Sequence, residues 1–414
     1  MLSEHQKLLQ IIDLGADLAR FSDLDILLER VLTLARRFVN AEAGSLYIRD
    51  GASLQFAHTQ NELLERRLPA GKKLVYTTFS IPVDDQSLAG SVAKTGSPLN
   101  IGDVYQIASN KTYHFNKAYD EKTGYRTQSV LTVPLIASQG NVVGVLQLIN
   151  ARNEDGALLP FDKADEPFVV HFANSAAMAI ERAQMTRALI LRAIKMAEMR
   201  DPMETGPHVN RVGAYAVAIY ETWAARRGME DEEVAPLKDV LRMGAMLHDV
   251  GKVAIPDRIL KKPGRLTQEE FEVIKQHPML GAQLFSEQYS PFDGAAHLIA
   301  LTHHERWDGT GYPGFIDPMT GATLQGHATA DGKARGKKGE EIPPFGRVAA
   351  IADVYDALSR RRVYKEPWEE GRVLETMEAE SGKHFDPEMI TAFFTSLEGL
   401  RAISKRYPDI ESAR

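Results

Sequence analysis

The sequence predicts two domains: an N-terminal α+β domain with an antiparallel sheet, joined by a long helix to an all-α domain. Three observations support this fold class. The chain has 414 residues, and a domain usually holds about 100–200 residues, so two domains are expected. Helix and strand patterns are mixed in the first part of the chain. After Asp201-Pro202 the hydrophobic pattern is almost purely helical.

Hydrophobic spacing predicts the elements of the N-terminal domain. Apolar residues recur at helical intervals across residues 24–39, which indicates an amphipathic helix. Strands are predicted where β-branched and apolar residues are concentrated, at 45–49, 54–58, 129–136 and 142–150. The turn between the last two strands is supplied by Gln139-Gly140-Asn141. The order of helix, strands and helix favours an antiparallel sheet.

A long helix is expected to follow the sheet. Residues 161–166 include acidic side chains, which suit the start of a helix. Apolar residues at three- and four-residue spacing then form a seam from Val169 to Ala197. This seam indicates either a parallel dimer stalk that carries a signal between domains or one helix packed on its own domain. The predicted boundaries are 1–184 for the first domain, 185–200 for the linking helix and 201–414 for the second domain.

Composition excludes several classes of protein. With 44% hydrophobic and 25% charged residues, both halves are expected to fold. The sequence has no cysteine, so any metal must be held by His, Asp and Glu. The net charge of −7 argues against broad binding to nucleic-acid polymers or anionic membranes. Neither a signal-peptide pattern nor an apolar run of about 18 residues is present, so a cytoplasmic protein without membrane insertion is expected.

Histidines and carboxylates in the second half form a candidate polynuclear metal site. Imidazole and carboxylate ligands without thiolates suit iron, manganese or zinc. Two metals about 3.5–4 Å apart commonly split phosphodiesters, because they activate water and stabilise charge on the phosphate. A carboxylate such as that of Asp249 could bridge such a pair. The candidate ligands are Glu204, His208, His248, Asp249, His277, His303, His304 and Asp353.

Two short segments carry additional local signals. Glu204 and His208 are four residues apart and would share one face of a helix. This pair could hold a third ion, or it could be a surface glutamate and a hydrogen-bonded histidine. In the segment 247–252, Gly251 allows the backbone to pass closely, and Lys252 could meet a phosphate oxygen.

Residues from about 200 to 394 resemble the HD-GYP family of cyclic dinucleotide phosphodiesterases, a subgroup of the HD metal-dependent phosphohydrolases. The matching motifs are Arg200-Asp201-Pro202, His248-Asp249 with Gly251-Lys252, His277-Pro278, His303-His304-Glu305, Gly311-Tyr312-Pro313, Ala352-Asp353, Tyr355-Asp356-Ala357-Leu358 and Phe385-Asp386-Pro387. The resemblance implies that the candidate ligands bind metal, that Asp249 bridges two ions in catalysis, and that Lys252 faces the phosphate. Glu204 matches a glutamate of family members that bind three metals, usually iron or manganese. A trinuclear centre is therefore expected, with two ions as the minimum.

The chain departs from the family pattern at two places. Where the family carries Arg-Pro-Tyr-Arg or Arg-Pro-Tyr-Lys, residues 362–365 read Arg-Val-Tyr-Lys. Arg362 and Lys365 keep the charge expected to bind substrate phosphates, and Val363 replaces the proline. Residues 315–337 form an insert of roughly twenty residues, expected to be a long, mobile loop. Its basic residues could make it a lid over an anionic substrate, and a protein contact or a neutral loop are the alternatives.

Residues from about 24 to 183 resemble a GAF sensor domain. The resemblance rests on residues 41–47, on the strand pair 131–136 and 144–150, and on the helix start at 161–166. GAF domains that bind cyclic nucleotides carry a motif that Asn150, Phe161, Asp165 and Glu166 fit, whereas Ala151 replaces its lysine. A small ligand is one interpretation. The other is a domain that mainly dimerises, with Phe161 in the core and the acidic pair capping a helix.

Together the two resemblances imply hydrolysis of cyclic di-GMP to linear pGpG, and onward to GMP, regulated by the GAF domain. A hydrolase that prefers cyclic GMP-AMP would use the same metal chemistry. From a different class, the chain could be a cyclic dinucleotide receptor or scaffold with little turnover. A general HD nucleotidase would have no need of the Gly-Tyr-Pro region. A homodimer is expected, with signalling proteins as further partners at that region.

Overall fold

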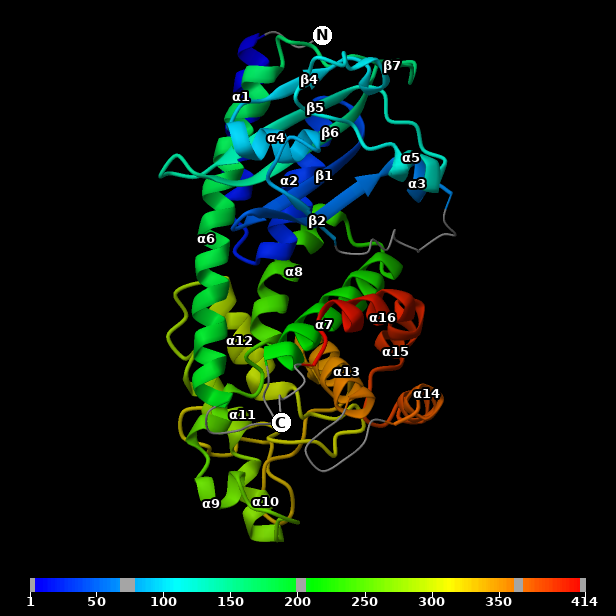
Figure 1. Ribbon diagram of the computed structural model, residues 1–414. Helices are drawn as coiled ribbons and strands as arrows, with labels where there is room; N and C mark the ends of the chain where they lie inside the picture. The colour runs from blue at the N-terminus through cyan, green and yellow to red at the C-terminus, as the bar shows by residue number, and fades with distance from the viewer. Residues whose placement is uncertain (1–3, 68–78, 199–205, 361–367, 410–414) are drawn as a thin grey trace. The chain divides into compact units, whose positions relative to one another are not determined.

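Figure 1 shows a computed structural model of the chain, which describes residues 4–67, 79–198, 206–360 and 368–409. The chain divides into two compact units, residues 1–187 and 188–414. The predicted fold class is confirmed, because the first unit combines helices with an antiparallel sheet and the second is helical. Among the described helices, none is at once long and apolar enough to cross a membrane.

The first unit is built on one antiparallel sheet. Within the described residues the sheet has seven strands in the order β3-β2-β1-β6-β5-β4, with β7 beside β6. The four predicted strands are confirmed as β1, β2, β5 and β6. The pattern missed β3, β4 and β7, which span only two or three residues each. The bounds are β1 (Ala41–Asp50), β2 (Ser53–Asn61), β3 (Ser80–Pro82), β4 (Leu99–Ile101), β5 (Val130–Ile136), β6 (Val142–Arg152) and β7 (Leu158–Leu159).

Helices pack on both faces of this sheet. A Cβ added to Gly44 of β1 would lie 2.8 Å from Leu32 Cδ1 of α2, so α2 lies directly on that face. Side chains alternate along a strand, and Tyr47 on the other face joins Val92 of α4 in a buried cluster. The helical elements of the unit are α1 (Glu4–Leu18), α2 (Leu24–Phe38), α3 (Glu62–Glu65), α4 (Leu88–Thr95), η1 (Val104–Gln106), α5 (Ala118–Thr123) and the start of α6 (Glu166–Glu198).

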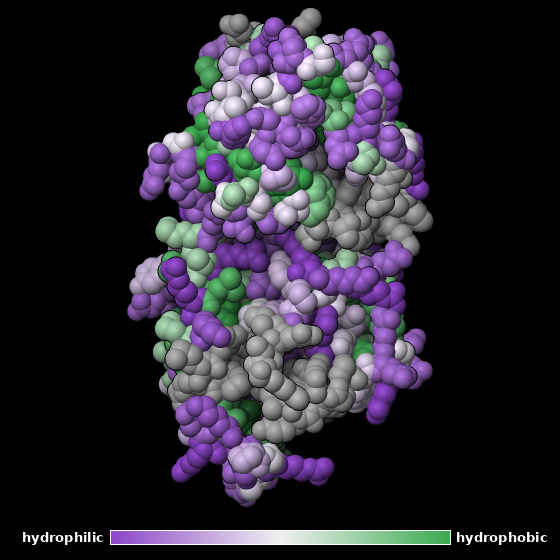
Figure 2. All heavy atoms as spheres, in the orientation of Figure 1, coloured by the Kyte–Doolittle hydropathy of each residue, from purple (hydrophilic) through white to green (hydrophobic). Residues whose placement is uncertain are grey.

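The long helix α6 confirms the predicted helix after the sheet, and the first half of the predicted seam packs on its own domain, which supports the second of the two interpretations. The seam residues from Val169 to Ala183 are buried within the first unit. A second stripe is exposed instead, and it consists of Met178, Met185, Leu189 and Met196, which are 54–65% exposed. In Figure 2, hydrophobic atoms gather along the left edge of the first unit, where α1 and α6 lie in Figure 1. The spacing of this stripe by seven, four and seven residues fits alternate a and d positions of a heptad.

The residues singled out for a cyclic-nucleotide motif have packing roles in the structure. Asn150 is fully buried; its Nδ2 donates to Tyr125 Oη at 2.9 Å, and its Oδ1 accepts from Gln128 N at 2.7 Å. Phe161 lies in the core. The carboxylate of Asp165 pairs with Lys7 of α1, just before α6 begins at Glu166. These contacts support the interpretation in which Asn150, Phe161 and Asp165 stabilise the domain.

The second unit is helical, as predicted. Its described residues contain no strand, only isolated bridges at 316–323, 328–334 and 381–385. Helix α7 packs against α8, α13 and α15, and α12 packs against α8, α11 and α13. The helical elements are α7 (Gly206–Arg226), α8 (Asp231–Ala245), η2 (Val250–Ala254), α9 (Asp257–Leu260), α10 (Gln268–Ile274), α11 (His277–Gln283), α12 (Pro291–Thr302), η3 (Gly339–Glu341), α13 (Pro344–Ser359), α14 (Glu370–Ala379), α15 (Pro387–Thr395) and α16 (Leu397–Arg406).

Candidate metal centre

Seven of the eight predicted ligands come together in two groups. In each group the ligand atoms lie within 4.8 Å of one another. We call Asp249, His277, His303 and His304 cluster A, and His208, His248 and Asp353 cluster B. Cluster A draws on η2, α11 and the end of α12, whereas cluster B draws on α7, the end of α8 and α13. Residues far apart in sequence thus meet because these helices pack together.

Asp249 lies between the two clusters. Its Oδ1 is 2.9 Å from His277 Nε2 and 3.5 Å from His303 Nε2. Its Oδ2 is 3.4 Å from His248 Nε2 of cluster B. Among the described residues, none donates a hydrogen bond of normal geometry to the buried Oδ1. A buried carboxylate oxygen surrounded by imidazole nitrogens fits a cation, so the residues present would suit metal ions at clusters A and B, with Asp249 between the two clusters.

Electrostatics keep these groups in the forms that bind metal. Burial raises the pKa of Asp249, but Lys252, His248 and His277 outweigh that effect and hold this pKa well below its usual range. Burial lowers the pKa of His303, and burial together with the neighbouring imidazoles lowers that of His304 strongly. The carboxylate is therefore ionised and these two imidazoles are neutral, as coordination requires.

Backbone carbonyls orient three of the imidazoles. The Nδ1 atom lies 2.8 Å from Ala245 O in His248, 2.7 Å from Ile274 O in His277 and 3.0 Å from Ala300 O in His303. Because a carbonyl can only accept, each Nδ1 must carry the proton. Nε2 then keeps its lone pair for a metal, which is the usual arrangement around histidine ligands.

In His208 a carboxylate takes the place of the carbonyl. Its Nδ1 lies 2.8 Å from Oδ2 of Asp356, which is 2% exposed. Arg211 holds the same carboxylate through Nε at 2.6 Å and Nη2 at 2.8 Å. The prediction from sequence did not include Asp356 among the site residues. Its position three residues after Asp353, on the same face of α13, was the signal that could have identified it.

Gly251 sets the distance between η2 and α11. A Cβ at this position would lie 2.0 Å from His277 O and 2.3 Å from Gly281 N. Both atoms belong to the backbone, so they cannot move aside as a flexible side chain would. The close approach that the sequence predicted for this glycine therefore brings His277 within reach of Asp249.

The Gly311-Tyr312-Pro313 signature lies directly against the histidine pair. The Tyr312 ring stacks on His304, with centroids 4.9 Å apart and planes inclined by 24°. A Cβ on Gly311 would lie 2.3 Å from Arg306 N, so only glycine permits this approach. The Tyr312–Pro313 peptide bond is cis. None of the three residues of the signature belongs to cluster A or B, and Tyr312 packs on the candidate ligand His304.

Of the remaining predicted site residues, Lys252 is described by the structure, and Glu204, Arg362 and Lys365 are not. Lys252 Nζ lies 2.5 Å from Asp249 Oδ2, at the edge of the two clusters. Glu204, the predicted ligand of a third ion, lies outside the described residues. The same holds for Arg362 and Lys365, the predicted phosphate-binding pair, and for Val363 between them.

Two family models match the chain. The GAF domain model matches residues 23–180, and the HD domain model matches residues 205–358. The first match covers the sheet with its flanking helices. The second covers every ligand of clusters A and B. The chain therefore contains a GAF domain followed by an HD domain.

Similar proteins carry names that describe cyclic dinucleotide hydrolysis. A "Cyclic di-GMP phosphodiesterase" of Vibrio cholerae is 42% identical over 219 residues, which are 52% of this chain and 40% of that protein. A "Probable cyclic di-GMP phosphodiesterase" of the same organism is 34% identical and covers 71% of this chain and 62% of its own length. A "3'3'-cGAMP-specific phosphodiesterase 2", also from Vibrio cholerae, is 33% identical over 56% of this chain and 39% of its own. The chain thus spans 39–62% of the length of these three relatives.

Replacing Gly251 with alanine is expected to disrupt cluster A. The added methyl group would press on the backbone of α11, and overpacking of this kind costs about 1–3 kcal/mol or more. Thermal unfolding and the metal content per chain measure the effect. Gly399→Ala is the matched control, because Gly399 has open space around it in α16 and the same change in a helix stabilises by about 0.5–1 kcal/mol. Normal stability and metal content in the Gly251→Ala variant would contradict the close-packing account.

The Asp356→Asn variant is expected to bind metal about 10–100-fold more weakly at cluster B, as is typical when the partner of a histidine ligand is changed. The amide keeps the shape but loses the charge that holds His208 and Arg211. Titration of metal-free protein against a competing chelator would measure this affinity. Glu370→Gln, which neutralises an exposed partner of Arg401, should leave it unchanged. An affinity in Asp356→Asn equal to that of the unmodified chain would refute the orienting role.

Proposed function

We propose that this chain, a GAF domain joined to an HD domain, is a metal-dependent phosphodiesterase that hydrolyses cyclic di-GMP to linear pGpG and onward to GMP. The observation that carries the proposal is the position of Asp249, whose two oxygens face clusters A and B. A pair of ions held in this way suits attack on a phosphodiester, because both the attacking and the leaving oxygen need stabilisation. The similar proteins named for this activity support the choice of substrate.

Iron or manganese is the proposed metal. Cluster B consists of two imidazoles and one carboxylate, with Asp353 Oδ1 3.7 Å from His208 Nε2 and 3.8 Å from His248 Nε2. Two histidines and one carboxylate are typical ligands of non-haem iron. When bound, the ions supply a nucleophile from water at neutral pH and offset charge on the phosphate. We retain Glu204 as the proposed ligand of a third ion.

The chain's own residues are proposed to position the substrate. Lys252 Nζ, now paired with Asp249, can turn to a phosphate oxygen because its side chain is still 20% exposed. Arg362 and Lys365 are proposed to bind the second phosphate, since a guanidinium and an ammonium group are the usual partners of phosphate. Tyr312 keeps the His304 ring in place by stacking on it.

Two other functions are alternatives. A preference for cyclic GMP-AMP would use the same metal centre, and one of the similar proteins is named for that substrate. A receptor or scaffold with little turnover belongs to a different class. The seven gathered candidate ligands favour an enzyme, because a protein that only binds the dinucleotide has no need of two adjoining clusters of carboxylate and imidazole groups.

We further propose that the GAF domain regulates the hydrolase through α6, in response to a small ligand or a protein partner, in the cytoplasm. In the second unit, Ile194 of α6 packs in one buried cluster with Val209 and Leu247. These two residues directly adjoin His208 and His248 of cluster B. A rotation or shift of α6 would therefore change the packing beside two candidate ligands.

The Gly311-Tyr312-Pro313 region is the proposed contact for signalling proteins.

A homodimer is proposed on the exposed stripe of α6 rather than on the seam first predicted from sequence. Met178, Met185, Leu189 and Met196 repeat at heptad positions along 33 residues of continuous helix. A heptad stripe favours pairing with an identical stripe of a second copy. Exposed Leu8, Leu9 and Ile12 on α1 add apolar surface in the first unit. Burial of this surface would stabilise the pair.

Loss of the bridging carboxylate provides the test of activity. Asp249→Asn is expected to lower cyclic di-GMP hydrolysis at least about a thousandfold, because metal-assisted charge stabilisation is worth several kcal/mol. Asp155→Asn, the same change at an exposed loop residue of the first unit, should leave turnover intact. Cyclic di-GMP, cyclic GMP-AMP and mononucleotides should be assayed side by side with metal-loaded protein. Turnover of mononucleotides alone, or turnover unaffected by the change at Asp249, would refute the proposal.

The dimer can be tested at the centre of the stripe. Met185→Glu places a charge at a 62% exposed position that a partner helix would bury, so dimerisation should weaken at least about tenfold, or 1.4 kcal/mol. Leu159→Glu is the control, because Leu159 is also apolar and 46% exposed but lies on β7. Sedimentation equilibrium gives the dissociation constants. Equal constants for the two variants would exclude α6 as the dimer interface.

A further inference from the structure

We propose that residues 315–337, the insert, act as a brace that positions cluster A, with Glu305 as its anchor. The inference rests on the proposed function only insofar as cluster A binds metal. The insert contacts both elements that carry the imidazoles of cluster A, namely the segment after α12 and helix α11. It therefore acts on one half of the centre, and Glu305 is a positioning residue rather than a catalytic one.

Glu305 holds the two ends of the insert together. It directly follows His303-His304 and is 2% exposed. Its Oε1 accepts from Gly314 N at 2.6 Å, and its Oε2 accepts from Lys337 N at 3.0 Å. Gly314 precedes the insert and Lys337 ends it. The buried carboxylate of Glu305 thus ties both ends of the insert to the backbone directly after His303-His304.

The body of the insert contacts helix α11, which begins at His277. Gln283 Nε2 of this helix donates to Pro318 O at 2.8 Å. One turn nearer the ligand, Met279 lies against the insert, because a Cβ on Gly321 would be 3.1 Å from Met279 Sδ. A displacement of the insert would therefore be transmitted to the helix that carries His277.

The insert has its own packing, as a brace requires. The Phe315 and His327 rings stack with centroids 3.9 Å apart and planes inclined by 13°. Backbone bonds run from Leu324 N to Phe315 O at 2.8 Å and from Arg335 N to His327 O at 2.8 Å. The long loop expected from sequence is thus folded around an aromatic pair.

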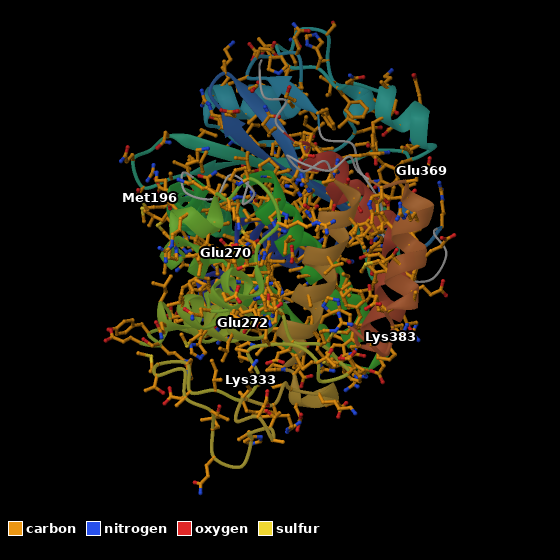
Figure 3. All side chains as sticks on the ribbon, turned by 90° about the horizontal axis from the view of Figure 1, so that it is seen from below. Met196, Glu270, Glu272, Lys333, Glu369 and Lys383 are labelled. Atoms are coloured by element: carbon orange, nitrogen blue, oxygen red, sulfur yellow. The ribbon has the colours of Figure 1, made fainter. Side chains whose placement is uncertain are left out.

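Two basic residues of the insert, Arg335 and Lys337, are engaged within the protein, which argues against a basic lid. Arg335 binds both carboxylate oxygens of Glu341, at 2.9 and 2.8 Å. Lys337 Nζ donates to Gly314 O at 2.5 Å, and its side chain is 14% exposed. Figure 3 labels Lys333 of the insert and Glu272 of α10; the pKa of this carboxylate is lowered first by its hydrogen bond to Lys275 and further by the charge of Lys333. Because Arg335 and Lys337 already have partners within the protein, neither is available to bind an anionic substrate.

Removal of the insert is the direct test. A Cβ on Gly314 would lie 3.2 Å from Gly336 Cα, so residues 315–335 can be replaced by a short glycine link without stretching the chain. Metal-free protein would be titrated with Mn²⁺ alone, and the bound ions counted and followed by electron paramagnetic resonance. We expect the Mn²⁺ affinity of one class of site to fall roughly 10–100-fold, as it does when the residues that support a metal ligand are changed. The resonance spectrum of two magnetically coupled Mn²⁺ ions should be lost with it. The other class should keep its affinity.

Point variants keep the test decisive even if the shortened chain does not fold. Glu305→Gln weakens the anchor and Gln283→Ala removes the bond to Pro318, so both should lower Mn²⁺ affinity at one class of site severalfold. Asp331→Asn is the matched control, because Asp331 is exposed on the insert and bonds to Thr329. Full affinity at both classes of site in Glu305→Gln and Gln283→Ala would overturn the brace.

The test also separates the brace from a lid and from the proposed function. A higher KM for cyclic di-GMP with unchanged Mn²⁺ affinity would assign the insert to substrate binding and overturn the brace. Selective loss of Mn²⁺ affinity supports the brace whether or not cyclic di-GMP is turned over. Absence of turnover by the unmodified, metal-loaded chain would then count against the proposed function alone.

Discussion

The ionised carboxylate of Asp249 is the constraint on which the second unit depends. Burial of an isolated charge costs several kcal/mol, so it must be offset by neighbouring charges or a cation. Here Lys252 and the surrounding imidazoles hold its pKa well below the usual range despite burial. Three of these imidazoles are in turn oriented by backbone carbonyls, and His208 by Asp356. The packing of α7, α8, α11, α12 and α13 is thus tied to the geometry around one buried carboxylate.

The two clusters are supported by different parts of the chain. The insert contacts the elements of cluster A through Glu305 and Gln283. Helix α6 packs beside the ligands of cluster B through Ile194. This difference offers a physical route to regulation. A shift of α6 would alter the packing beside cluster B, while the contacts of the insert with the elements of cluster A stay in place. A metal pair works only when both halves are in place.

Sequence predicted which side chains gather at the site better than it predicted their surroundings. Residue type and motif identified His248, Asp249 and five further candidate ligands that the structure brings together, and metal binding by them stays a prediction. Asp356 was missed because its role depends on His208 and Arg211, which lie about 145 residues away in sequence. The apolar seam on α6 was predicted correctly as a helical stripe. Three-four spacing alone does not tell whether a stripe packs on its own domain or stays exposed. The exposed stripe, which includes Met178 and Met185, lies on another side of the helix. The stacking of Phe315 on His327 within the insert had no periodic signal at all. The predicted roles of Glu204, Arg362 and Lys365 stay predictions, because these residues lie outside the described part of the chain.

The proposed hydrolysis of a cyclic dinucleotide requires metal at both clusters, with Asp249 between them. The most direct measurement adds Fe²⁺ or Mn²⁺ stepwise to metal-free protein and follows bound metal and cyclic di-GMP hydrolysis in the same samples. We expect little turnover with the first equivalent of metal and a steep rise once metal occupies both clusters. Full occupancy of both clusters without hydrolysis, or full activity with a single ion, would contradict the proposal.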